Sequence, residues 1–330
     1  NICGNSSMGL IRAERCHKVR IHDNFIYRDS ASWASTGIVP YADSGEVAYL
    51  KDVIVANNIL VDTDIDCKLS EGLVITGNEL RNGTYGIDTN GIRVANAVAP
   101  VISDNLVIGA GGSGIEIAEV TYGKVSGNII RNCGQGGLAE LYDETYFGTG
   151  TTAVGQATLT VTGTPNLLGT YGQFGQIVVL DTGADAGTTL IIVSHTNTVM
   201  TLLNPTTGLA YVATATAGSL QYHITLGRYG IFQNAVAYQG CRYNDIINND
   251  CFDDQVSKTQ LYGIFSNNQS SNAEIKGNRL IGNTNRFYNG ASLSEASFTN
   301  RYRELIKDMF FDVADDIATA VHAAIAGTGA

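Results

Sequence analysis

A short pattern that returns seven times constrains this chain more than any other feature of its sequence. Each copy has Ile or Val, two residues, Asn, one residue and an apolar residue. The copies are "IHDNFI", "VANNIL", "ITGNEL", "ISDNLV", "VSGNII", "IINNDC" and "IKGNRL", and their asparagines are Asn24, Asn58, Asn78, Asn105, Asn128, Asn249 and Asn278. The first four spacings, 34, 20, 27 and 23 residues, scatter about one turn of coil, with loops absorbing the excess. Stacked coils of a solenoid behave in this way.

The residues within each copy favour strands over helices. Ile, Val and Tyr dominate, and apolar residues alternate in "GIEIA" and "GIRVA", as in half-buried strands. No helical periodicity appears before residue 299. We expect the asparagines to take the left-handed conformation of a sharp corner, and their stacked amides to form a hydrogen-bonded ladder.

Two stretches 23 residues apart, "NGIRVANAVAP" and "SGIEIAEVTYG", share a glycine and an inward apolar residue but exchange Arg93 for Glu116. Residue 137 opens a third such stretch, "GLAE". The expected columns are Gly91, Gly114 and Gly137; Ile92, Ile115 and Leu138 facing inward; and Arg93, Glu116 and Ala139 facing outward. Neighbouring coils lie about 4.8 Å apart. The shared residues therefore build the coil, and the exchanged residues face solvent or a ligand.

These repeats resemble the right-handed parallel β-helix proteins of the pectate-lyase-like superfamily. The resemblance covers residues 1–142 and 226–293, and it extends to bacteriophage tailspikes and polysaccharide depolymerases. It implies an all-β fold: a single-stranded parallel β-helix of three sheets with an apolar interior and an exposed sheet face where sugar chains bind. The motifs are specific for the fold and weak for the reaction.

The expected divisions are N-terminal coils over 1–144, an insertion over 145–227, further coils over 228–293 and a tail over 294–330. The insertion is rich in Thr, Gly and Val, with Asp181 and Asp185 as its charged residues, and predicts a small antiparallel β domain. It could bind sugar, bound a groove, pack on another subunit or act as a stabilising flap. Because the sequence starts without Met inside a repeat-like stretch, we also expect that an upstream segment has been removed.

The tail predicts the one helix of the chain, an amphipathic α-helix. Its apolar positions recur every four residues: Leu305, Met309, Val313, Ile317, Val321 and Ile325. Such a helix could cap the last coil. A second set of apolar residues in the tail, spaced alternately four and three positions apart, fits a homotrimer contact, although this set spans fewer than three heptads.

Composition narrows the possible binding partners and the cellular location of the protein. A formal charge of −11 excludes a nucleic-acid-binding surface. No run approaches the roughly 18 apolar residues of a membrane span, so we expect no membrane insertion. The six cysteines have no regular spacing, and we expect most to be small buried residues rather than a disulfide framework. With the resemblance, this predicts a protein of the virion tail or the extracellular space.

Enzymes of the family that the repeats resemble cut polysaccharides by hydrolysis with paired carboxylates, or by β-elimination with an Arg or Lys base. The densest acidic cluster on consecutive coils gives the catalytic candidates Glu116, Glu119, Glu140 and Asp143. The register that turns Ile117 inward also turns Glu140 inward, where burial would raise its pKa. The alternative is that this cluster is a solvated surface.

The substrate-binding candidates lie beside that cluster: Asp88, Arg93, Tyr122 and Tyr142. Tyrosines could stack on sugar rings, although buried or turn-lining tyrosine is the more frequent role. The stretch "DTDID", with Asp62, Asp64 and Asp66, lacks the glycine and glutamate of an EF-hand, so a solvated strand face is expected there. We assign no metal and no cofactor, apart from Ca²⁺ in the case of a lyase.

Three functions remain open. The first is a tailspike-like endoglycosidase that hydrolyses a bacterial surface polysaccharide. The second is a polysaccharide lyase of the same fold, which is disfavoured because a chain of net charge −11 repels polyuronates. The third is a non-catalytic glycan-binding adhesin or structural spike. A secreted epimerase acting on polyuronates is a further class, but it would need calcium and the sequence shows no characteristic repeat for it.

Overall fold

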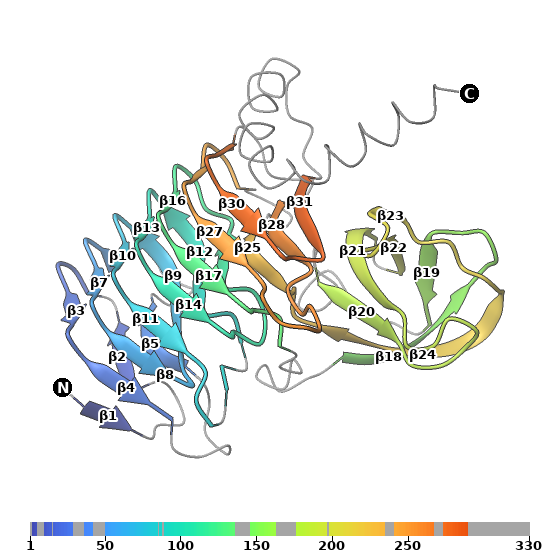
Figure 1. The fold of residues 1–330 in the computed structure, drawn as a ribbon, viewed down its shortest axis with the longest axis horizontal. Coiled ribbons are helices and arrows are strands. Elements are labelled where there is room, and N and C mark those ends of the chain that lie inside the picture. Colours follow the sequence, from blue (N-terminus) through green and yellow to red (C-terminus); the bar gives the residue numbers. More distant parts are fainter. Residues whose placement is uncertain are drawn as a thin grey trace, which may run out of the picture.

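The computed structural model describes residues 2–4, 10–14, 16–28, 36–41, 50–84, 86–87, 89–135, 146–162, 176–196, 198–234, 241–266 and 273–289. Within these ranges the chain is all-β, with three parallel sheets wound as a β-helix and one antiparallel sheet beside them (Figure 1). The predicted fold class is thereby confirmed. The predicted C-terminal helix falls outside the described residues.

Sheets A and C consist of three-residue strands, and from β3 onward their central side chains point into the coil. Sheet A runs in the order β1 (Ile2–Gly4), β4 (Phe25–Tyr27), β8 (Ile59–Val61), β11 (Glu79–Arg81), β14 (Leu106–Ile108), β17 (Ile129–Arg131), β27 (Asp250–Phe252) and β30 (Arg279–Ile281). Sheet C runs in the order β29 (Glu274–Lys276), β26 (Asp245–Ile247), β16 (Lys124–Ser126), β13 (Val101–Ser103), β10 (Val74–Thr76), β7 (Ile54–Ala56) and β3 (Arg20–His22). Each residue stacks on its equivalent one coil away.

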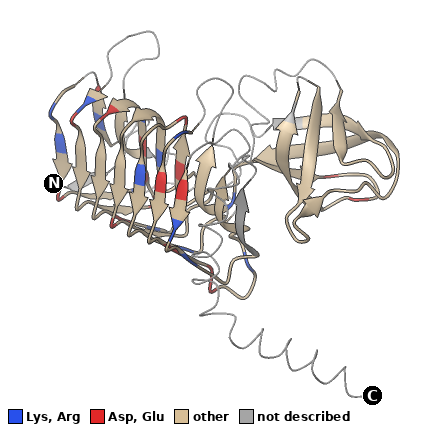
Figure 2. Ribbon diagram, turned by 90° about the horizontal axis from the view of Figure 1, so that it is seen from above, with Lys and Arg blue, Asp and Glu red and all other residues tan. Residues whose placement is uncertain are grey.

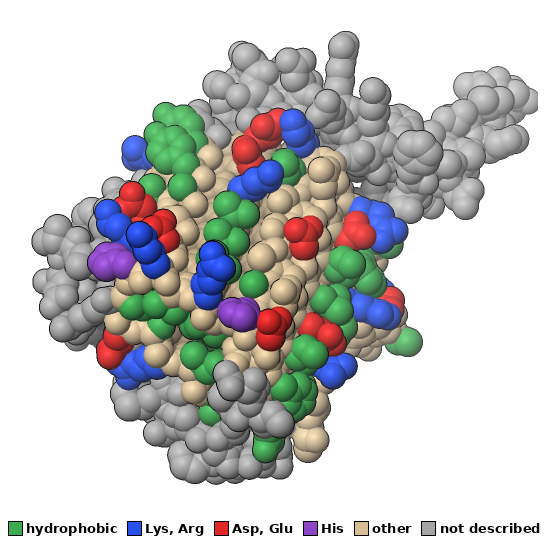
Figure 3. All heavy atoms as spheres, turned by 90° about the vertical axis from the view of Figure 1, so that its left-hand side faces the viewer, with side chains coloured by type: hydrophobic (Ala, Val, Ile, Leu, Met, Phe, Trp, Pro, Cys, Tyr) green, Lys and Arg blue, Asp and Glu red, His purple; other side chains and the backbone are tan. Residues whose placement is uncertain are grey.

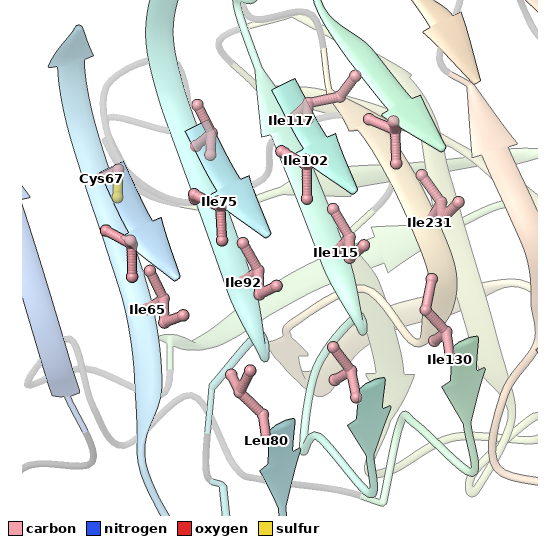
Figure 4. Close-up of a cluster of buried hydrophobic side chains, with 14 of the residues drawn as sticks. Ile65, Cys67, Ile75, Leu80, Ile92, Ile102, Ile115, Ile117, Ile130 and Ile231 are labelled. Carbon is pink, nitrogen blue, oxygen red and sulfur yellow. The ribbon is translucent and has the colours of Figure 1, made fainter. Parts of the chain in front are cut away.

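Sheet B has the longer strands. Its order is β2 (Ile11–Glu14), β5 (Thr36–Tyr41), β9 (Asp64–Glu71), β12 (Ile92–Val98), β15 (Ile115–Ala118), β25 (Tyr229–Asn234), β28 (Tyr262–Ser266) and β31 (Asn285–Asn289), and β6 (Leu50–Lys51) also pairs with β9. Aliphatic columns from all three sheets meet in the coil (Figure 4); the sheet B column is Ile38, Ile65, Ile92, Ile115, Ile231 and Ile264, all fully buried. Burial of one such side chain contributes about 1.5–3 kcal/mol.

All seven repeat asparagines form the predicted ladder. In each step the Nδ2 of one asparagine donates to the Oδ1 of the next, at 2.8 to 3.0 Å, from Asn24 to Asn278. The backbone N–H of each also donates to the same oxygen, as Asn105 N does to Asn128 Oδ1 at 3.1 Å. Such a network satisfies buried amides while fixing the register of the coils.

The prediction that these asparagines adopt the left-handed conformation is wrong. The residue before each one does so instead: Asp23, Asn57, Gly77, Asp104, Gly127, Asn248 and Gly277. The preceding residue turns the corner, so the amide that follows it can point into the coil. At Gly77, with a φ of 64°, an added Cβ would lie 2.6 Å from Asn57 Oδ1, so the glycine leaves room for the asparagine side chain at the corner before it.

The predicted columns hold for two coils and change at the third. Ile92 pairs with Ile115 and Arg93 with Glu116, as expected. The next coil, however, places Ile231 beside Ile115 and Phe232 beside Glu116. Gly230 thus stands where Gly137 was expected and Phe232 where Ala139 was expected, because the coil resumes only after the inserted domain. Residues 137–139 lie outside the described residues.

The inserted domain is a small closed barrel. Its antiparallel sheet runs in the order β19 (Thr158–Val161), β18 (Tyr146–Thr152), β24 (Ala217–Thr225), β20 (Ile177–Leu180), β21 (Thr189–His195), β22 (Val199–Asn204) and β23 (Leu209–Ala210), and β19 also pairs with β22. This last pairing closes six strands and leaves β23 attached to β22. The interior is filled by side chains such as Leu159, Leu202 and Tyr222.

The cysteines behave as predicted where their side chains are described. Cys67, Cys133, Cys241 and Cys251 are buried, Cys16 is partly buried, and all five are free thiols. Burial raises the pKa of the Cys133 thiol to about 12, so it stays protonated and packs as a small apolar residue.

Candidate functional site: the charged face of sheet B

The outer face of sheet B carries charged side chains on three adjacent strands. On β9 the inward residues are Ile65 and Cys67, so the alternate residues Asp66 and Lys68 face outward. Register brings Arg93 of β12 beside Asp66 and Glu116 of β15 beside Arg93. We call the four outward residues Asp66, Lys68, Arg93 and Glu116 the charged face. Asp64 starts β9 and is buried.

Opposite charges alternate across this face. Lys68 Nζ lies 3.1 Å from Asp66 Oδ2, Arg93 Nη1 lies 3.3 Å from Asp66 Oδ1, and Arg93 Nε lies 3.3 Å from Glu116 Oε2. These side chains are only 8–39% exposed. Partial burial strengthens such pairs relative to fully solvated ones.

Glu116 faces outward as predicted, yet it is only 6% exposed. Its Oε2 accepts a hydrogen bond from Asn90 Nδ2 at 2.6 Å, and its Oε1 accepts one from Asn234 Nδ2 at 2.8 Å. Together with Arg93, these donors engage both carboxylate oxygens. Glu116 is therefore built to hold Asn90, Arg93 and Asn234 in place.

Neither Asn90 nor Asn234 was identified from the sequence. A signal was available for each: Asn90 precedes the column glycine Gly91, and Asn234 ends the repeated stretch "RYGIFQN". What could not be foreseen is that β25 follows β15 directly across the insertion, which brings Asn234 to Glu116.

Asp64, buried at the start of β9, is the described carboxyl group whose pKa is most perturbed. It is 4% exposed, and burial raises its pKa to about 8; the hydrogen bond from Thr89 opposes this shift and the charge of Asp66 adds to it. Thr89 Oγ1 donates to Asp64 Oδ2, while the buried Oδ1 has no hydrogen-bond partner within the described part of the chain. Burial therefore favours the protonated form of Asp64.

The prediction of a solvated strand face at "DTDID" is wrong. Asp62 and Asp64 are 1% and 4% exposed, and Asp66 is partly buried. Asp62 lies in the left-handed turn before β9, where its Oδ1 accepts hydrogen bonds from the N–H groups of Gly83 at 2.5 Å and Gly86 at 2.7 Å. The sequence shows the alternation of polar residues, but the strand sequence alone does not predict that a loop packs over them and buries them.

Asp64 and Asp66 thus form a pair of carboxyl groups in different environments. They lie two residues apart on β9, which puts their Cα atoms about 6.6 Å apart. Asp66 is held between two cations, whereas Asp64 is buried without one. Carboxyl groups in such different environments can act as an acid and a base.

The other predicted site residues lie elsewhere or outside the described residues. Glu119 follows β15 in a left-handed turn with φ 52°, and its N–H donates to the carbonyl of Asn234 at 3.0 Å. Tyr122 lies beyond the next corner, 63% exposed, and stacks on Tyr243. Four candidates fall outside the described residues: Asp88, Glu140, Tyr142 and Asp143.

The barrel bounds the charged face on its C-terminal side. Ile177, Ile191 and Leu203 of the barrel form one buried cluster with the outward aromatic residues of the next two coils, Tyr229, Phe232, Tyr262 and Phe265. Phe232 is the direct neighbour of Glu116. The outer face of sheet B is therefore charged up to β15 and covered by the barrel at β25 and β28.

Charge is distributed unevenly between the two parts of the molecule. Figure 2 shows charged residues along the solenoid and few on the barrel, whose described residues include only two formally charged ones, Asp181 and Asp185. Viewed toward the N-terminal end of the solenoid, acidic and basic side chains are interspersed (Figure 3). No helix of the described ranges has the length and apolarity to cross a bilayer. Within those ranges no three His, Cys, Asp or Glu side chains are grouped as metal ligands.

Comparison with known proteins gives one family match and a set of similar structures. Residues 1–146 match the family described as "Periplasmic copper-binding protein (NosD)". The A-module of mannuronan C-5 epimerase AlgE6 from Azotobacter vinelandii is 11% identical, with a TM-score of 0.48, covering 88% of this chain and 54% of that one. The A-module of AlgE4 from the same organism is 9% identical, with a TM-score of 0.28, covering 87% and 78%. The chain thus spans about half of the AlgE6 structure, and no curated protein sequence matches it.

Proposed function

We propose that this chain binds a polysaccharide across the charged face and hydrolyses it, with Asp64 as the proton donor and Asp66 as the base. One observation carries the proposal: two carboxyl groups lie two residues apart on β9, one of them buried with a raised pKa and the other placed between Arg93 and Lys68. Glycoside hydrolysis needs a protonated and an ionised carboxyl group.

In the proposed reaction, protonated Asp64 gives its proton to the glycosidic oxygen as the bond to the anomeric carbon breaks. Asp66 takes a proton from the water whose oxygen attacks that carbon, so the two carboxyl groups exchange protonation states and then re-equilibrate with solvent. Inverting enzymes hold their two carboxyl groups roughly 6.5–9.5 Å apart, which leaves room for the attacking water, and inversion is the outcome that this scheme predicts.

Arg93 and Lys68 pair with Asp66 in this scheme, and Glu116 fixes Arg93 from the other side. Asn90 and Asn234 are 6% and 2% exposed and hold Glu116 in place from within the protein. The barrel would limit how far the sugar chain extends toward β25.

The proposed substrate is a bacterial surface polysaccharide, and the proposed setting is outside the cytoplasm. The periplasmic family matched by residues 1–146 supports that location. The similar A-modules are named for an epimerase of mannuronan, which is a polysaccharide. A tailspike-like homotrimer on a virion is the finer form of this proposal, to be tested by the mass of the protein in solution.

The test is a cleavage assay on capsular polysaccharides and lipopolysaccharides, with new reducing ends as the readout. Asp64→Asn and Asp66→Asn should each lower the rate by about 10²- to 10⁴-fold. Glu71→Gln is the matched control, because Glu71 is an exposed residue of the same strand paired with Lys51. The sequence-based pair is tested in the same assay with Glu116→Gln and Glu119→Gln. Full activity in both aspartate variants would refute the assigned acid and base.

A non-catalytic glycan-binding adhesin is the second candidate. The observation in its favour is that both oxygens of Glu116 are engaged within the protein and that Asp64 is almost fully buried. Binding without new reducing ends, and with unchanged affinity in Asp64→Asn, would favour it. A lyase would instead yield unsaturated uronate, detected by its ultraviolet absorbance.

A further inference from the structure

The corner between sheets B and C carries a row of exposed residues that the charged face does not use. The row is Lys18, Asp52, Gly72, Ala99, Tyr122 and Tyr243, and all six are in the left-handed region, with φ between 51° and 67°. The N–H of each donates to the carbonyl of the residue before the next member, as Ala99 N does to Thr121 O at 2.8 Å. These residues therefore occupy the same position on six consecutive coils.

Two of these positions hold tyrosines that lie in solvent. Tyr122 and Tyr243 are 63% and 50% exposed, and their rings stack at 5.1 Å between centroids with an interplanar angle of 7°. The corner needs only the left-handed backbone, which Lys, Asp, Gly and Ala provide at the other four coils. A left-handed conformation is unfavourable for a bulky residue, so two exposed tyrosines are not explained by the turn.

The coils before Tyr122 leave one face of its ring uncovered. The next two members of the row are Ala99 and Gly72, which offer no side chain long enough to reach the ring. Beyond them the carboxylate of Asp52 leans over Gly72, where an added Cβ would lie 3.3 Å from Asp52 Oδ1. Because this carboxylate lies over Gly72, the open step between it and the aromatic face of Tyr122 is two coils long, about 10 Å.

We propose that this step, bounded by Tyr122 and Asp52, is a glycan subsite that takes one uncharged pyranose ring. The sugar stacks its apolar face on Tyr122 above Ala99, and its hydroxyls donate to the Asp52 carboxylate across Gly72. This rests on the proposed function, since it takes the ligand to be part of the same polysaccharide, held at the corner that follows the charged face.

The chemistry of the two ends selects the ligand. An aromatic ring attracts the C–H face of a sugar, and a carboxylate is an acceptor only, which suits hydroxyl donors. Asp52 would repel a uronate ring bound in the step. Both ends are exposed, so the subsite would add affinity for long chains without altering the chemistry at Asp64 and Asp66.

The test measures binding of neutral capsular polysaccharides, with a polyuronate for comparison, by affinity electrophoresis of protein carrying Asp64→Asn, so that the ligand is not cleaved. Adding Tyr122→Ala should weaken binding by about tenfold, the equivalent of one aromatic contact, whereas Tyr122→Phe should retain it. Ala99→Leu should also weaken binding, because leucine covers the open ring face, and Leu69 shows that leucine is accommodated at φ 54°. Ala99→Ser is its matched control. Asp52→Ala should reduce binding of the neutral glycan.

Unchanged affinity in Tyr122→Ala and Ala99→Leu would overturn the subsite, as would the absence of binding to any glycan or tighter binding of the polyuronate than of neutral chains. The proposed hydrolysis fails by a different measurement, namely no new reducing ends with the unmodified protein. Binding that depends on Tyr122 without any cleavage would keep the subsite and remove the reaction.

Discussion

The solenoid and the inserted barrel fix the register of their strands in opposite ways. The solenoid has open ends and parallel strands from distant parts of the chain, and it fixes its register with one buried amide per coil. The barrel closes on itself through β19 and β22, has antiparallel neighbours and keeps an apolar interior. An open stack needs a directional bond to set its register, whereas closure and short connections set it in a barrel.

The same contrast holds for charge. The solenoid places carboxyl groups in partly buried pairs on sheet B, whereas the described barrel has two aspartates near its surface. The region with buried charge is the one that can perturb a pKa strongly, and for that reason the candidate chemistry lies on the solenoid. The barrel contributes a cover for the coils that follow.

The largest expected effect comes from separating the two regions. Phe232→Ala removes a buried ring from the cluster shared by the barrel and sheet B and should cost about 3–5 kcal/mol. It should also let the barrel unfold independently, giving two transitions in denaturant. Leu202→Ala, buried inside the barrel, is the matched control and should lower only the barrel transition. A single unchanged transition in Phe232→Ala would mean that the interface does not couple the two parts.

The second effect tests the amide ladder. Asn105→Ala leaves the N–H and Nδ2 of Asn78 without their acceptor and should destabilise the solenoid by about 2–4 kcal/mol, measured by chemical denaturation. The control is Asn57→Gly at an exposed left-handed corner, where glycine is favoured and little change is expected. Equal losses in the two variants would show that the ladder has no special role.

The third effect is a pH dependence of the solenoid. The pKa of Asp64 is raised from 3.8 to about 8 by burial. Between these values the unfolded state binds fewer protons than the folded state, so the contribution of Asp64 to stability falls as pH rises from about 4 to about 8. As pH rises across this range, the free energy of unfolding of Asp64→Asn should therefore increase relative to that of the unmodified protein by about 1–3 kcal/mol. Parallel stability curves for the two proteins would contradict the buried, protonated state.

The smallest effect has the opposite sign and belongs to the barrel. Slight burial of Asp185 acts to raise its pKa. Hydrogen bonds from Thr214 and Tyr211 outweigh this effect, so the pKa of Asp185 is lowered. Its contribution to stability is present above its ordinary pKa of 3.8 and is lost as pH falls below that value. Asp185→Asn should cost about 1 kcal/mol at neutral pH and nothing in strong acid, as thermal melting at the two pH values can show. The same cost at both pH values would exclude a role for the charge.

Much of the solenoid could be predicted because its determinants are local and repeated. The apolar–Asn–apolar pattern marks each coil, and the shared glycine and isoleucine correctly pair Arg93 with Glu116. The third coil was misplaced because a similar stretch, residues 137–139, precedes the insertion while the true partner, β25, follows it. Sequence similarity between repeats does not say which of them are neighbours when a domain intervenes.

The candidate site was predicted less well, for a related reason. The sequence directed attention to Glu116, and the structure places it on the expected face, where its oxygens are engaged by Asn90, Arg93 and Asn234. It gave no indication that Asp64 would be buried, since that depends on Thr89 and the loop before β12 packing over the start of β9. The alternation within "DTDID" was visible, but the degree of solvation was not.

The sequence by itself determined the winding: residues that recur once per coil must stack, and stacking turns the same positions inward and outward along the whole solenoid. The tertiary structure alone decided which outward residues are chemically unusual. Protonation depends on what lies within a few ångströms of a carboxyl group, and on sheet B those neighbours come from other coils and from beyond the inserted barrel.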